Sequence, residues 1–209
     1  LSGNFSNSKF TDYNGELGYL NGELMKRATV LYDLDSSDLH LIMEEDSDGR
    51  VLEWQEGLNF NSGSVLIKYR FEQNPEKPET KKEWGEVELK NLSIKYEDRF
   101  RRLKGLKGKI YYDEEKIRVE NVAGRYGDSS LLLEGEIDRT KPSNPEFSLR
   151  LKFPELLKKD LKDIPFFDDF NFLGPANISM NINGTPENIK FEQQADLTTT
   201  KYKIASFIQ

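Results

Sequence analysis

Apolar and polar residues alternate along much of this chain with the two-residue period of β-strands. The clearest case is the stretch 107–138, in which three alternating runs are separated by turn signals at 113–115 and 124–128. In its last run Leu133 falls on an apolar side and Glu134 on a mostly charged side. Because successive side chains of a strand point to opposite faces of a sheet, this stretch predicts a three-stranded meander with one apolar face.

The middle run of that meander follows the same scheme. Ile117, Val119 and Asn121 share one side of the run, and Arg118 and Glu120 share the other. We therefore expect the first three side chains to face the apolar side of the sheet.

The pattern recurs before and after the meander. Alternating runs at 28–34, 65–71, 147–153 and 178–182 predict further strands, each with an apolar side. Residues 154–164 change to helical spacing and begin with a proline, which suits a first helical turn. Together these runs predict an all-β fold of about a dozen strands, mostly antiparallel, with one short helix near 154–164.

A charged segment with two prolines, residues 72–83, separates two of these runs. Its composition cannot bury much surface, so we expect a mobile loop there. The loop would end an N-terminal β segment, residues 1–83, and precede a second region, residues 84–209. We expect both regions to belong to one continuous sheet.

The apolar parity changes within the run that follows this segment. Val87 and Leu89 share one side, whereas the next apolar residues are Leu92 and Ile94. A shift of one residue would turn them to the opposite face of an unbroken strand. We therefore predict a β-bulge or a strand break near Asn91.

Composition narrows the possible functions. The 209-residue chain has a net charge of −7, which gives no general attraction to nucleic acid or to an anionic membrane. The basic run 99–104 is a local exception that fits a solvated loop or strand end, or else contact with phosphate headgroups.

The chain has no cysteine, which excludes disulfides, thiol nucleophiles and Cys-based zinc sites. No apolar run approaches the roughly 18 residues of a spanning helix. Because the chain starts at Leu1 rather than Met, we expect a segment of a longer protein.

Motifs for catalysis or metal binding are weak. Any Ser-His-Asp catalysis would need the single histidine, His40, which we interpret as a surface or half-buried residue. Residues 127–131, Gly-Asp-Ser-Ser-Leu, superficially resemble the nucleophile block of some lipases, but their position between two strands predicts a hairpin turn. Residues 46–49 begin like a calcium loop, yet Gln55 stands where a bidentate acid is needed. We expect no enzyme, no metal site and no cofactor.

The apolar sides of the strands need a cover, and two architectures supply one. A sandwich or closed barrel would bury these sides in a shared core. A sheet curved into a trough would leave them partly open to acyl chains, since burial of each CH₂ contributes about 0.8 kcal/mol. The residue pattern by itself leaves both architectures open.

Residues 84–202 resemble the AsmA-like family of bacterial envelope proteins, the AsmA, TamB and YhdP group. The resemblance rests on a Gly-x-Ile strand, an Ile-Arg-Val-Glu-Asn-Val run, a Gly-Arg-Tyr-Gly turn and a Leu-x-Leu-x-Gly-x-Ile strand, at 108–110, 117–122, 124–127 and 131–137. A second block, residues 174–197, is similar to the same group.

The resemblance implies an elongated, twisted sheet folded into an apolar groove that shields phospholipid acyl chains. It implies a periplasmic location, an inner-membrane anchor outside this segment, and contact with neighbouring repeats. It further implies lipid transport between the inner and outer membranes in support of outer-membrane integrity, with no nucleic-acid partner. The expected lining of the groove consists of apolar positions on four strands: Leu131, Leu133, Ile137, Phe147, Leu149, Leu151, Ile178, Met180, Ile182 and Phe191.

Two other functions remain open at this point. A closed core with functional loops would suit a non-enzymatic scaffold or a protein-interaction module of the cell envelope. A hydrolase would have to use His40, and its activity would be lost in the His40→Ala variant.

Overall fold

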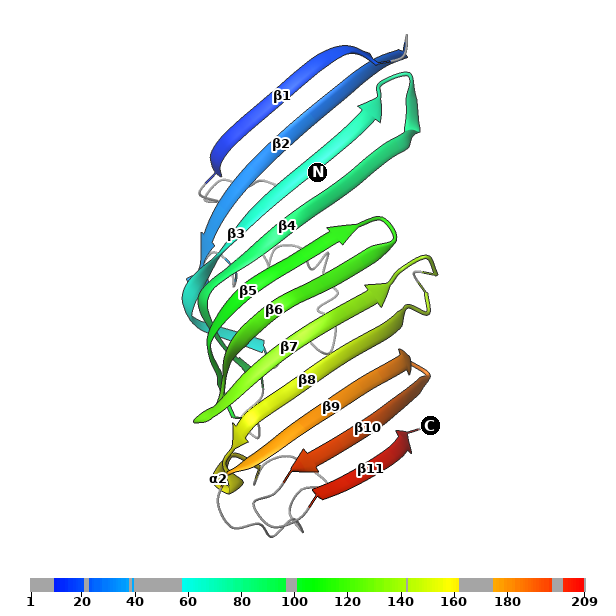
Figure 1. The fold of residues 1–209 in the computed structure, drawn as a ribbon. Coiled ribbons are helices and arrows are strands. Elements are labelled where there is room, and N and C mark those ends of the chain that lie inside the picture. The colour runs from blue at the N-terminus through cyan, green and yellow to red at the C-terminus, as the bar shows by residue number, and fades with distance from the viewer. Residues whose placement is uncertain are drawn as a thin grey trace.

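A computed structural model describes most of the chain as one sheet (Figure 1). The residues that it describes are 10–20, 23–37, 39, 58–96, 101–141, 143–161, 175–196 and 201–208. Eleven strands follow one another in the sheet in the order of the sequence, and every neighbouring pair is antiparallel. The all-β prediction is therefore confirmed, in the form of an open, curved meander.

The strands differ in length, and the longest two lie in the N-terminal half. A short helix, α2, separates β8 from β9. The elements are β1 Phe10–Leu20, β2 Glu23–Asp35, β3 Leu58–Asn74, β4 Lys77–Tyr96, β5 Leu103–Asp113, β6 Lys116–Tyr126, β7 Ser129–Asp138, β8 Glu146–Leu156, α2 Lys158–Leu161, β9 Ala176–Thr185, β10 Asn188–Asp196 and β11 Lys201–Ile208.

Two-residue turns join several of these strands, as is usual for antiparallel neighbours. The β5–β6 turn is 114–115, where the Asp113 side chain accepts hydrogen bonds from the backbone N–H groups of Glu115 (2.9 Å) and Lys116 (2.7 Å). The β6–β7 turn is 127–128, and Gly127 adopts a φ of 61° there. The predicted meander of three strands is therefore confirmed, and its second turn is tighter than the stretch 124–128.

The prediction of a mobile loop at 72–83 is wrong. These residues form the ends of β3 and β4, joined by a two-residue turn at 75–76. Thr80 holds this hairpin end together, because its hydroxyl donates to the Lys77 carbonyl (2.7 Å) and accepts from the Asn74 N–H (3.2 Å). Charged residues are compatible with strands here because most of their side chains are exposed to solvent.

The helix is shorter than predicted and starts later. β8 continues through Pro154 to Leu156, and α2 begins only at Lys158, so a helical turn starting at 154 is wrong. The residues at helical spacing nevertheless pack inward, since Leu156 and Leu161 are both buried. Residues 162–164 lie outside the described part of the chain.

The predicted bulge at Asn91 is confirmed. Asn91 has a φ of 58°, and the register of β4 with β5 shifts between Lys90 and Leu92. On the neighbouring strand β3, Gly63 lies against this bulge with a φ of 89°, and an added Cβ there would come within 2.3 Å of the Asn91 carbonyl oxygen. Only a glycine fits so close an approach.

A second bulge, which was not predicted, lies on β6. Asn121 has a φ of 50°, and the register with β7 shifts between Val119 and Val122. Val119 and Val122 are therefore both buried, while Asn121 is exposed rather than turned to the apolar side as expected. Bulges increase the local twist and bend a strand. Figure 1 shows β3 to β6 curving strongly towards their lower ends.

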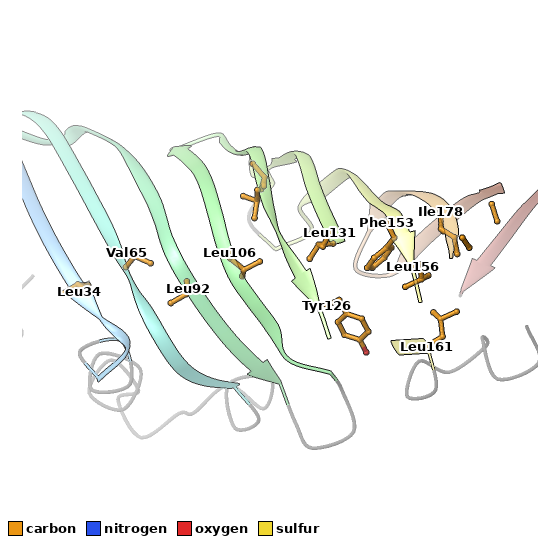
Figure 2. Close-up of a cluster of buried hydrophobic side chains, with 14 residues drawn as sticks. Leu34, Val65, Leu92, Leu106, Tyr126, Leu131, Phe153, Leu156, Leu161 and Ile178 are labelled. Atoms are coloured by element: carbon orange, nitrogen blue, oxygen red, sulfur yellow. The ribbon is translucent and has the colours of Figure 1, made fainter. Parts of the chain in front are cut away.

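The core runs across the strands rather than along them. Each strand from β2 to β10 contributes at least one buried apolar side chain, and Figure 2 shows these side chains on successive strands. The core residues are Leu34, Val65, Leu92, Leu106, Val119, Val122, Tyr126, Leu131, Phe153, Leu156, Leu161, Ala176, Ile178 and Ala195.

Candidate functional site

The ten expected lining residues lie on one face of the sheet, which we call the apolar face. Residues directly opposite each other in an antiparallel pair point to the same face. Leu133 lies opposite Leu151, which in turn lies opposite Met180. The same applies to Ile137 with Phe147, Leu149 with Ile182, and Ile182 with Phe191.

Two of the ten residues differ from the others in burial. Leu131 and Ile178 belong to the buried core, with exposed fractions of 6% and 3%. The other eight are half-buried within the described structure. The apolar face is thus closed along the core and partly open beyond it, so the open portion is lined by eight of the expected residues.

The apolar face also extends over strands that were left out of the expected lining. Tyr32 of β2 lies opposite Ile67 of β3, and the row continues through Val87 of β4 and Ile110 of β5 to Val119 of β6. The alternation in the runs 28–34 and 65–71 predicted an apolar side on each of these strands. They were left out of the expected lining because they lie outside the family resemblance, which covers residues 84–202.

From Val119 the row passes through Gly135, Leu149 and Ile182 to Phe191 of β10. One row of directly opposed residues therefore crosses nine consecutive strands. With neighbouring strands about 4.8 Å apart, such a row measures about 38 Å. The hydrocarbon part of one bilayer leaflet is only about 15 Å thick, so the row exceeds the length of an extended acyl chain.

The N-terminal part of the apolar face is aromatic. The ring of Tyr112 lies over Gly85 on the neighbouring strand, where an added Cβ would come within 2.4 Å of it. The Tyr69 hydroxyl donates a hydrogen bond to Glu83 (2.5 Å). Burial raises the pKa of Tyr69, with Tyr112 and Tyr32 adding to the effect. Burial likewise raises the pKa of Tyr112, and Tyr32 adds to it, so both hydroxyls stay protonated at neutral pH.

The opposite face is polar, and ion pairs cross its strands. Lys109 pairs with Glu86 (2.5 Å), Lys116 with Glu136 (3.4 Å) and Arg150 with Glu134 (3.5 Å). The last two pairs border a hollow of about 630 Å³ over β6 to β9, whose lining includes Glu134, Glu136 and Arg150. Exposed ion pairs of this kind stabilise a protein by at most about 1 kcal/mol each.

A buried polar cluster ties α2 to the β6–β7 turn. Asp160, 3% exposed, accepts hydrogen bonds from the Ser129 hydroxyl (2.7 Å) and from the Asp128 N–H (2.9 Å). Ser129 Oγ in turn accepts from the Leu157 N–H (2.9 Å). The block 127–131 thus forms a hairpin turn, as predicted, and its buried serine fixes the helix rather than pointing into a cleft.

The remaining candidates fall partly outside the described structure. His40, the segment 46–49 and Gln55 lie outside it, as do residues 99 and 100 of the basic run. In the described ranges, no three His, Cys, Asp or Glu side chains gather in a group that could hold a metal ion. Within the same ranges, no helix is long and apolar enough to cross a membrane.

Comparison with known proteins does not identify this chain. No family model, no curated protein and no solved structure matches it. The candidate site therefore consists of the apolar face described above, defined by its strand registers and by the exposure of its side chains.

Proposed function

We propose that this chain shields phospholipid acyl chains along its apolar face. The observation that carries the proposal is the row of opposed residues from Tyr32 to Phe191, which crosses nine strands of a single-layered sheet. In the described part of the chain no second sheet covers this row, and extensive contacts join only consecutive strands. Partly open aliphatic side chains such as Leu149 and Met180 suit an apolar ligand.

The energetics favour exchange rather than permanent capture. A tail of about fifteen methylene groups gains on the order of 12 kcal/mol when it leaves water for an apolar environment. A bilayer offers the same tail a similar gain, so transfer between a membrane and the apolar face is nearly balanced. The proposed mechanism is passive, with tails against the apolar face and headgroups at its polar margin. The chain itself provides no direction of transport.

The cellular setting that we propose follows from the AsmA-like resemblance of residues 84–202. The chain would be a periplasmic segment of a longer protein that is anchored in the inner membrane outside this segment. It would carry phospholipid between the inner and outer membranes and so support outer-membrane integrity. In the described sheet β1 and β11 are the edge strands, and free strand edges are where neighbouring repeats could continue a sheet.

Lipid mass spectrometry on the 209-residue chain purified from bacterial cells tests the proposal. We expect phospholipid to co-purify with the wild-type chain and to be lost from Met180→Asp, which places a charge on the apolar face. Asn181→Asp is the matched control: it adds the same charge one residue away, and its carboxylate can still accept the hydrogen bond from Arg150.

Circular dichroism shows whether each variant keeps its β content, so that lipid loss is not confused with unfolding. If the folded wild-type chain carries no lipid, or if both variants keep it equally, the acyl-chain proposal fails. A folded chain without lipid would instead favour the envelope scaffold or interaction module.

A further inference from the structure

The polar face carries a group of cations that departs from the charge pattern of the rest of the sheet. Across most strand pairs an acid faces a base, as in Glu134 opposite Arg150. Two pairs in the middle of the sheet place a cation opposite a cation: Lys90 with Lys107, and Lys104 with Arg125. They are the only cation pairs among the described strand registers. Like charges directly opposite each other destabilise a sheet, so this arrangement costs folding stability.

The first pair borders an open hollow beside the Asn91 bulge. This hollow of about 410 Å³ is lined by Lys90, Lys107 and Lys109, together with Glu88, which lies opposite Lys109. Lys90 has Asp33 at 3.7 Å. Lys107 is exposed and makes no ion pair within the described residues. Because Lys109 pairs with Glu86, Lys107 is the lysine of this hollow that has no ion pair within the described residues.

The second pair belongs to a cluster of cations around one carboxylate. Asp128 is met by Lys159 (2.5 Å) and Lys104 (3.8 Å), and Arg125 donates a hydrogen bond to the Asp128 carbonyl oxygen (2.6 Å). The hydrogen bond and charge of Lys159, with weaker effects of Lys104 and Arg125, hold the pKa of Asp128 below its usual value. Lys104 and Lys159 thus share the Asp128 carboxylate, and Arg125 meets the backbone of Asp128 rather than an acidic side chain.

We call the five residues Lys90, Lys104, Lys107, Arg125 and Lys159 the cationic strip. The two cation pairs are adjacent, because Lys107 lies opposite Ala123, two residues from Arg125 on the same face of β6. Lys90 pairs with Asp33, and Lys104 and Lys159 share Asp128, whereas Lys107 and Arg125 make no ion pair within the described residues. In a chain of net charge −7, such a local excess is a specific feature.

An exposed leucine lies next to the cationic strip. Leu132 is 41% exposed on the polar face and lies opposite Ala123 on one side and Lys152 on the other. An apolar side chain among cations fits the boundary between lipid headgroups and acyl chains. Surfaces for single-stranded nucleic acid instead present aromatic rings on which bases stack.

We propose that the cationic strip and Leu132 form a docking surface for the anionic phosphate headgroups of a lipid bilayer. The strip would hold the outer face of the sheet against a membrane surface, whether or not the apolar face carries lipid. This function goes beyond acyl-chain shielding, because Leu132 and the four cations of the strip that lie on strands face away from the apolar face. Each Lys or Arg near an anionic bilayer strengthens binding by about fivefold.

Co-sedimentation with lipid vesicles tests this inference. We expect the 209-residue chain to bind vesicles of equal parts phosphatidylcholine and phosphatidylglycerol, and to leave phosphatidylcholine vesicles unbound. Binding should weaken in high salt, which screens exposed charges. The Lys104→Gln/Lys107→Gln variant should bind about 25-fold more weakly. Leu132→Ser should also weaken binding, whereas the exposed control Lys190→Gln on β10 should match the wild type.

Stability provides a second measurement. Lys107→Gln should leave the chain as stable as the wild type, or slightly more so, because it removes the repulsion with Lys90. Weaker vesicle binding without a loss of stability would show that the lysine serves binding rather than folding.

Three results would overturn the inference: equal binding to both kinds of vesicle, unchanged binding of the double variant, or tighter binding to a single-stranded oligonucleotide than to anionic vesicles. Full competition by inorganic phosphate at the same phosphate concentration would also count against bilayer docking, since it would indicate a site for free anions. A chain without co-purifying lipid that still sediments with anionic vesicles would refute acyl-chain shielding and leave this inference intact.

Discussion

At the scale of single residues, the buried pair of Ser129 and Asp160 has the clearest consequence for stability. The Asp160 carboxylate lies in the interior and accepts hydrogen bonds from the Ser129 hydroxyl and the Asp128 N–H. A buried charged group that loses a partner destabilises a protein far more than an exposed group does.

Ser129→Ala should therefore lower the free energy of unfolding by about 1–3 kcal/mol, since it removes a donor to Asp160 and the acceptor of the Leu157 N–H. Urea denaturation followed by circular dichroism measures this change. Ser130→Ala is the control, because Ser130 is the exposed neighbour on the same strand and its loss should change stability by less than about 0.5 kcal/mol. Equal effects of the two substitutions would contradict a structural role of the buried cluster.

At the scale of elements, the bulges determine how the strands curve. Asn91 and Asn121 adopt left-handed backbone conformations on β4 and β6, and Gly63 and Gly108 lie against them on β3 and β5. Because these four strands are neighbours, the irregular positions line up across the sheet and bend it along one line.

Asn121→Val should destabilise the chain by about 1–2 kcal/mol, since a β-branched residue does not tolerate a φ of 50°. Asn177→Val is the matched control on β9, where an exposed asparagine has an ordinary strand conformation and valine is a good strand residue. Thermal unfolding of the two variants measures the difference. Similar melting temperatures would show that the bulge tolerates valine.

The sequence predicts those elements whose evidence is local. Alternation assigns the strands and places Leu133, Leu151 and Met180 on one face, and the change of parity at Asn91 reveals the first bulge. The bulge at Asn121 has a similar signal, since the buried apolar residues change parity from Val119 to Val122, but the prediction placed Asn121 on the apolar side and missed it.

Other features depend on contacts that the sequence does not display. The charged composition of residues 72–83 predicted a loop, whereas these residues form the solvated end of a long hairpin. Composition alone cannot distinguish the two. The partly open apolar face was equally undetermined, because its cover depends on whether a second layer packs there. The N-terminal half of the face, with Tyr69 and Tyr112, was missed for a different reason: the expected lining was limited to positions 131–191, although the resemblance itself begins at residue 84.

At the scale of the whole molecule, exposed acids with lowered pKa values make stability depend on pH. Lys159 is the main cause of the lowered pKa of Asp128, and Lys77 is the main cause of the lowered pKa of Glu23. Hydrogen bonds from Thr140 lower the pKa of Asp138. A carboxyl with a lowered folded-state pKa stabilises the fold above its unfolded value and loses this contribution as pH falls through the folded value.

We therefore expect the melting temperature to fall as the pH drops below the ordinary pKa values, 4.5 for Glu and 3.8 for Asp, and passes through the lower folded-state pKa values of Glu23, Asp128 and Asp138. Differential scanning calorimetry at neutral and acidic pH measures this loss. It should shrink in high salt, which screens exposed pairs such as Asp128 with Lys159. A melting temperature that rises on acidification would contradict the assignment.

The order of the strands has a consequence for cooperativity. Each strand from β1 to β11 pairs only with those next to it in the sequence, so the described sheet behaves as a one-dimensional series of units. In such a series stability is approximately a sum of local terms, and structure can start at any hairpin and spread in both directions. Contacts that are short in sequence also lower the entropic cost of folding. Unfolding can then proceed from the ends while the middle strands remain paired, and strands can be gained or lost at either end without rebuilding the rest.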